Sequence, residues 1–97
     1  MYPSTRKDKK YMVEIPTQSG RIKTVHFGQK GYSDYTIHKD DDRKERYINR
    51  HKDKENWNDI THAGFWSRWI LWNKKTLRAS INDTNHHFAL KIVYHSK

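Results

Sequence analysis

Seven histidines are the side chains in this sequence best suited to chemistry: His26, His38, His51, His62, His86, His87 and His95. Neutral imidazole is the commonest metal ligand near pH 7. The spacing does not favour a metal site, because no pair falls at i,i+4 on a predicted helix and the adjacent His86 and His87 would point to opposite faces of a strand. There is no cysteine to supply thiolate ligands. We therefore expect no metal and no other cofactor.

Three other patterns were weighed as catalytic sites. The acidic run Asp40 to Asp42 could hold a divalent cation for phosphodiester cleavage, but acids at a helix start serve more simply as capping and dipole residues. No serine lies in a Gly-x-Ser-x-Gly turn, and Gly28 to Gly31 is too short for a phosphate-binding loop, so it predicts a tight turn. The sequence indicates a protein that is not an enzyme and has no small-molecule substrate.

The charge of the chain indicates an acidic partner. Lys and Arg exceed Asp and Glu by 20 to 11, which leaves a net charge of +9. The excess lies in the two flanks, since residues 32–55 carry equal numbers of bases and acids. Eight side chains are the candidate contacts to a partner or to nucleic acid: Arg6, Lys7, Lys9, Lys10, Arg21, Lys23, Lys30 and Arg68. A merely solubilising surface is the alternative explanation of the same charge.

The elements that position these side chains begin with a polar segment. Residues 1–10 combine charge with a proline and predict an extended basic arm, which we expect to order only against another molecule. Alternation of apolar residues predicts a β-hairpin over residues 10–28, with its turn at Thr17 to Gly20. A loop should follow to Thr36, and then a helix from near Asp40 with acids at its start and bases toward its end.

The second half contains the apolar segments. Phe65, Trp69 and Trp72 recur at i, i+4 and i+7, which predicts a Trp-rich helix capped by Thr61, with these three rings in the core. Stacking of Trp57 or Trp66 on bases stays open. Thr76 should cap a third, short helix that ends near residues 82–85, and residues 88–95 alternate as a strand. We predict one α+β domain over residues 11–97, in which the last strand joins the sheet of the first hairpin.

Several stretches carry a resemblance to a known family: Tyr11 to Gly28, Gly31 to Thr36, His38 to Asp40, Arg46-Tyr47, Arg50-His51, Glu55 to Trp57 and Ala63 to Asn73. Together they resemble an uncharacterised family of small basic proteins of large nucleocytoplasmic DNA viruses. The resemblance implies a viral source, with the virion and the host cytoplasm or nucleus as its locations. It carries over no catalytic residue.

Two binding roles follow from the charge and the resemblance together. The first is a minor capsid or bridging component that contacts acidic surfaces of other virion proteins. The alternative is a sequence-nonspecific DNA-binding or genome-packaging protein, in which the same cations contact phosphates. No apolar run approaches the roughly 20 residues of a membrane span, and the first residues lack the apolar segment of a secretory signal. We therefore expect a chain without a membrane span.

Overall fold

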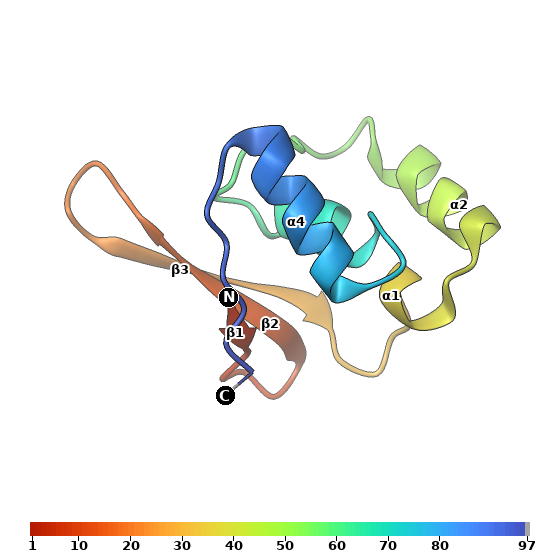
Figure 1. Ribbon diagram of the computed structural model, residues 1–97, viewed down its shortest axis with the longest axis horizontal. Coiled ribbons are helices and arrows are strands. Elements are labelled where there is room, and N and C mark those ends of the chain that lie inside the picture. The colour runs from red at the N-terminus through yellow and green to blue at the C-terminus, as the bar shows by residue number, and fades with distance from the viewer. Residues whose placement is uncertain (97) are drawn as a thin grey trace.

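The computed structural model describes residues 1–96 and has an α+β fold, as predicted. Three strands form an antiparallel sheet in the order β1-β2-β3: β1 (Tyr2–Pro3), β2 (Lys9–Pro16) and β3 (Ile22–Gln29). The helices follow: α1 (Tyr35–His38), α2 (Asp41–His51), α3 (Ala63–Trp66), the π-helical segment η1 (Ser67–Leu71) and α4 (Leu77–Phe88). α3 and η1 pack on β3, and α4 packs on η1. Figure 1 shows α2 on the opposite side of the molecule from the hairpin turn.

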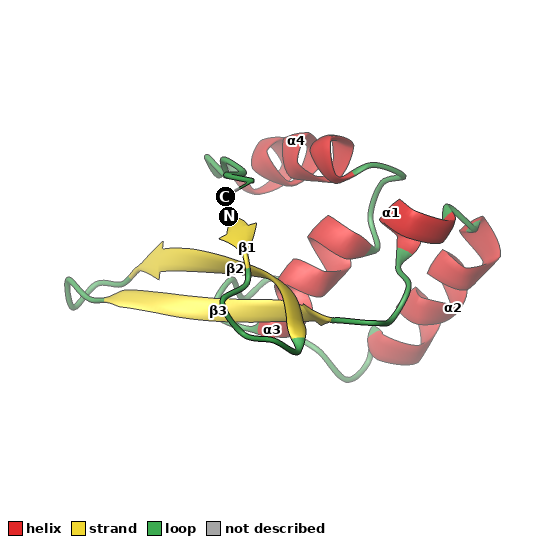
Figure 2. Cartoon of the chain, turned by 90° about the horizontal axis from the view of Figure 1, so that it is seen from below, coloured by secondary structure: helices red, strands yellow, loops and turns green. Residues whose placement is uncertain are grey.

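The β2–β3 hairpin confirms the predicted one within about a residue at each end. Val13 pairs with Val25 and Tyr11 with Phe27, so these apolar side chains share the inner face of the sheet. Gly20 closes the turn with a φ of +82°, a backbone conformation that glycine adopts without steric cost. The turn end of the hairpin projects beyond the helices (Figure 2).

Residues 1–10 do not form the separate arm expected from their composition. Tyr2 pairs with Met12 and Pro3 with Tyr11, and the side chain of Met1 is buried in the core. Arg6, Lys7 and Asp8 instead lie in the short loop between β1 and β2, and Lys9 and Lys10 begin β2. The expectation was wrong because two apolar residues at the start of the segment suffice to hold it on the sheet.

The Trp-rich segment is helical, but its buried face differs from the predicted one. Phe65, Trp66, Ile70 and Leu71 are buried, whereas Trp69 and Trp72 are only partly so. The π-helical turn explains the change, because it widens the repeat beyond 3.6 residues and rotates the later side chains. Thr61 is not the cap: His62 precedes α3, and the Thr61 hydroxyl donates to the Asp59 carboxylate at 2.6 Å.

α4 is longer than predicted and replaces the start of the predicted C-terminal strand. Thr76 caps it as expected, accepting from the Ala79 N–H at 3.1 Å. The helix continues through the polar residues 82–85 because these find partners: Thr84 donates to the Trp69 carbonyl, and the Asn85 side chain bonds both backbone groups of Ile92.

Residues 90–96 are extended but form no strand. The Met1 amino group donates to the Val93 carbonyl at 2.7 Å, and the His95 N–H donates to the Met1 carbonyl at 2.8 Å. This is the pattern of a single parallel bridge beside β1, without a ladder. The predicted strand therefore reaches the edge of the sheet at one point only (Figure 1).

Candidate functional site

The structure divides the eight predicted contact residues into three sets. Arg6, Lys7, Lys9 and Lys30 lie together at one end of the sheet, and we call them the sheet-end cluster. Arg21 and Lys23 are exposed at the opposite end, beside the hairpin turn. Lys10 and Arg68 are internal, so the prediction that they contact a partner has no support from their placement.

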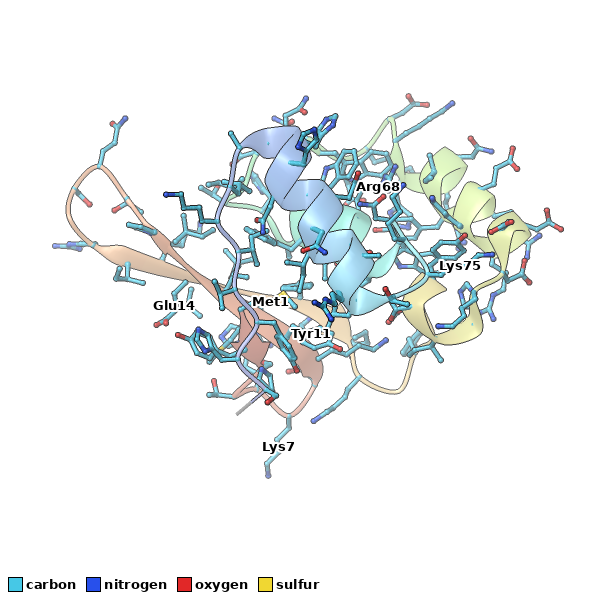
Figure 3. The ribbon with its side chains drawn as sticks, viewed as in Figure 1. Met1, Lys7, Tyr11, Glu14, Arg68 and Lys75 are labelled. Carbon is cyan, nitrogen blue, oxygen red and sulfur yellow. The ribbon has the colours of Figure 1, made fainter. Side chains whose placement is uncertain are left out.

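Two loops bring the sheet-end cluster together. The Lys30 N–H donates to the Asp8 carbonyl at 2.9 Å, which joins the end of β3 to the β1–β2 loop. That loop is shaped by Ser4, whose hydroxyl accepts from the Arg6 N–H at 3.0 Å. Arg6 and Asp8 form an exposed ion pair of 3.2 Å, and Lys9 donates to Gln29 at 3.4 Å. Lys7 points away from the body of the molecule (Figure 3).

Lys10 fixes the loop that carries Lys30 and the exposed Tyr32. Its ammonium group lies 2.6 Å from the Asp34 carboxylate and donates to the Tyr32 carbonyl. The side chains of Lys10 and Asp34 are only 15% and 3% exposed. The other Asp34 oxygen accepts from the Thr36 N–H and caps α1. The role of Lys10 is therefore to connect the sheet to the first helix.

Arg68 lies among aromatic rings in the helical layer. Its guanidinium carbon is 4.4 Å from the centre of the Trp69 ring and 5.5 Å from that of Trp57. It also donates to the Trp72 carbonyl at 3.0 Å, and burial lowers the pKa of Arg68. Figure 3 shows it away from the sheet. Trp66 is 3% exposed, so its ring is not accessible for stacking on bases. The Trp57 ring is partly buried and packs on Arg68.

A second group of lysines, which sequence reasoning missed, gathers where α1 and α2 meet the start of α4. Lys39 donates to the Lys75 carbonyl at 2.8 Å, and Lys44 donates to the Asn73 carbonyl at 2.6 Å. Burial, with Arg68 and Lys74 nearby, lowers the pKa of Lys44. The adjacent Lys74 and Lys75 were a signal in the sequence, but their approach to α2 required the fold.

Asp40, His51 and His62, which the sequence offered as groups for chemistry, have structural partners. Asp40 caps α2 by accepting from the Asp42 and Arg43 N–H groups, as predicted. His51 pairs with Glu55 at 2.9 Å and His62 with Asp59 at 3.1 Å. Among residues 1–96, no three His, Asp or Glu side chains gather as a metal site would require. Within the same range, no helix is long and apolar enough to cross a membrane.

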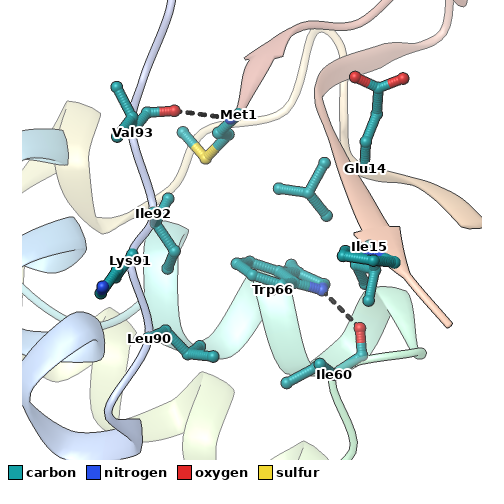
Figure 4. A pocket seen from close by; sticks show the side chains of 11 residues that line it. Met1, Glu14, Ile15, Ile60, Trp66, Leu90, Lys91, Ile92 and Val93 are labelled. Atoms are coloured by element: carbon teal, nitrogen blue, oxygen red, sulfur yellow. Dashed lines mark hydrogen bonds between the residues drawn. The ribbon is translucent and has the colours of Figure 1, made fainter. Parts of the chain in front are cut away.

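One apolar cavity lies between the hairpin and the C-terminal segment. It has a volume of about 220 Å³ and is lined mainly by Met1, Ile15, Ile60, Trp66 and Ile92 (Figure 4). The Trp66 indole N–H, which faces it, already donates to the Ile60 carbonyl at 2.8 Å. Glu14 and Lys91 stand on its rim. The residues that line the cavity include no cluster of polar side chains that could bind a polar ligand.

Comparison with known proteins gives a family and no function. The sequence model of a family described as "Family of unknown function (DUF5754)" matches residues 1–51, which include the sheet, the sheet-end cluster, α1 and α2. No curated protein and no solved structure matches the chain. Because the match spans 51 of 97 residues, the chain belongs to the DUF5754 family.

Proposed function

We propose that this chain is a non-catalytic structural protein of a virion, a minor capsid or bridging component that holds an acidic surface of another virion protein. One observation carries the contact role: four cations, from two joined loops and the first residue of β2, converge at the end of the sheet with one acid, Asp8, among them. The viral setting rests on the resemblance of the sequence alone. The sheet-end cluster is the contact surface of this proposal.

A DNA-binding role is the second candidate, and Tyr32 favours it. This ring is 70% exposed and follows Lys30 by two residues on the same loop. Cations that reach phosphates beside an exposed ring that stacks on bases are the two components of nonspecific binding to nucleic acid. The two roles use the same lysines, so they must be separated by experiment.

Cross-linking with a carbodiimide, which joins amines directly to carboxylates, tests the bridging role in purified virus particles. We expect Lys7 or Lys30 to be linked to Asp or Glu of another virion protein. Lys52 and Lys54 are also exposed but lie at the end of α2, and they serve as internal controls. Links confined to these two controls, or absence of the chain from the particles, would contradict the proposal.

A titration with duplex DNA at two salt concentrations tests the second role. Binding through several phosphates weakens steeply as salt rises. We would compare the double variant Lys7→Ala, Lys30→Ala with the matched control Lys52→Ala, Lys54→Ala. Affinity that falls with salt and is lost in the sheet-end variant alone supports DNA binding. Weak binding that is equal in both variants supports the bridging role.

A further inference from the structure

β3 is an edge strand, and the direction of its backbone groups follows from the hairpin. Among residues 1–96, β3 has β2 on one side and no strand on the other. The Thr17 N–H donates to the Arg21 carbonyl at 2.8 Å. Since bonded pairs alternate in an antiparallel ladder, the backbone groups of Lys23 and Val25 face β2. Those of Ile22, Thr24 and His26 therefore point outward.

The first part of this edge is accessible. The helices meet β3 on its inner face, where Phe27 packs on Trp66 with ring centres 6.1 Å apart. Toward the turn the hairpin extends past the helices (Figures 1 and 2). Ile22 is 59% exposed, and Thr24 is exposed as well. An accessible row of backbone N–H and C=O groups is a template for an added strand.

The charges along the edge select the kind of strand. Arg21 and Lys23 are exposed at its start, and the exposed Lys30 follows its end. Glu14, opposite Thr24, and Asp59, near Lys23, are the acids that face this region. A second copy of the chain would bring its own Arg21, Lys23 and Lys30 against these same cations and would be repelled. An acidic strand would be attracted along the length of the edge.

We propose that the outer edge of β3 binds an acidic, extended segment of a partner protein as a fourth strand of the sheet. This inference rests on the proposed function, of which it specifies the partner. Alternate residues of a strand face opposite sides of the sheet. Carboxylates on one side of the added strand meet Lys23, and apolar residues on the other side lie beside Ile22. Main-chain bonds form at Ile22, Thr24 and His26.

The test uses the full chain and a synthetic peptide of about ten alternating Glu and Val residues, somewhat longer than β3. Titration followed by amide hydrogen exchange should show new protection at Thr24 and His26, while Val25 stays as protected as before. The control peptide has the same sequence with an N-methyl group on every residue, so that it keeps the charge and loses the main-chain donors of both strand edges. We expect it to give no such protection.

Two variants of the chain complement the peptide control. Thr24→Pro removes one outward N–H and leaves the bonds to β2 intact, since proline is tolerated at edge positions. We expect it to lower the affinity for the peptide by about tenfold, which corresponds to the upper end of the net contribution of one hydrogen bond. Lys23→Glu should weaken binding too, whereas Lys52→Glu, on the far side of the molecule, should not. Thermal melting confirms that each variant is folded.

The outcomes separate this inference from the function on which it rests. If the peptide protects the loop around Lys30 but not Thr24, the edge is not the site and the proposed basic contact surface stands. If the chain does not bind this peptide but Lys7 or Lys30 is cross-linked to another virion protein, the inference fails and the proposed function stands. If the peptide does not bind and no such cross-link forms, both proposals fail. Protection of Thr24 that rises with the concentration of the chain alone would show a second copy on the edge, and would overturn the acidic partner.

Discussion

Helix α2 and the α3–η1 segment are both helical, yet the structure treats them in opposite ways. None of the residues of α2 is buried, whereas Phe65, Trp66, Ile70 and Leu71 of α3–η1 form much of the core. α2 is attached to the rest of the fold by a few side chains. Tyr47 stacks on Trp72 with ring centres 4.4 Å apart and planes within 2° of parallel, and Lys44 donates a hydrogen bond to the Asn73 carbonyl. A helix can thus depend on two or three side chains or on a whole buried face, and the two cases should respond differently to substitution.

The largest effect should come from the core segment. Phe65 is 0% exposed and packs edge-on against Trp66 and Phe88, so Phe65→Ala leaves a cavity between the sheet and α4. We expect it to lower the free energy of unfolding by about 3–5 kcal/mol, as large aromatic truncations in cores do. Urea unfolding measures the change. Phe65→Leu, which keeps most of the volume, should cost clearly less, and equal losses in both variants would argue against the packing explanation.

A smaller and more local effect should follow from Tyr47→Ala. Loss of the stack on Trp72 removes the main apolar contact of α2, worth about 1–3 kcal/mol for a partly buried ring. Because no residue of α2 is fully buried, we expect its amides to exchange faster while those of α3–η1 keep their protection. The matched control is Tyr32→Ala, which removes an exposed ring. Uniform loss of protection in both helices would mean that α2 and the core unfold as one unit.

The smallest effect concerns the start of α2 and depends on pH. The Asp41 carboxylate accepts from the Tyr35 hydroxyl, and this bond, with Lys75 nearby, holds the pKa of Asp41 below its ordinary value. Because the folded chain has the lower pKa, the bond stabilises the fold fully above the ordinary pKa of about 4 and is lost as pH falls through the lower, folded value.

Melting temperatures of the unsubstituted chain and of Asp41→Asn measure this term. The difference between them should be largest near neutral pH and should shrink as the pH falls below about 4. Tyr35→Phe, which removes the donor, should reduce the pH dependence in the same way. A difference that stays constant over the acidic range would show that the carboxylate contributes no charge-dependent stability.

Local sequence signals predicted the helices and strands well where the stabilising contacts are made by residues close in the sequence. The alternation of Val13 and Ile15, the Asp40 cap and the Thr76 cap depend on neighbours within a few residues, and each is confirmed. The length of α4 was missed because Thr84 and Asn85 are satisfied by Trp69 and Ile92, contacts that do not exist until the chain folds.

The placement of the candidate contact residues was predicted only in part, for the same reason. Charge alone cannot distinguish Lys7, which faces outward, from Lys10, which is held by Asp34 on another element. Arg68 was predicted as a contact to a partner, but the rings of Trp57 and Trp69 pack on it. What composition gave correctly was the presence of a cationic surplus at residues 6–30. Its division between the two ends of the sheet follows from the hairpin register.

The loop between β3 and α1 is fastened at both ends, by the bond from Lys30 to Asp8 and by the two oxygens of Asp34, one on Lys10 and one on Thr36. Its backbone is therefore already ordered before any partner arrives. A mobile arm with the same charges would lose conformational entropy when it bound, and that loss would reduce its affinity. On this fixed loop, binding through Lys30 and Tyr32 would cost only the conformational entropy of their side chains.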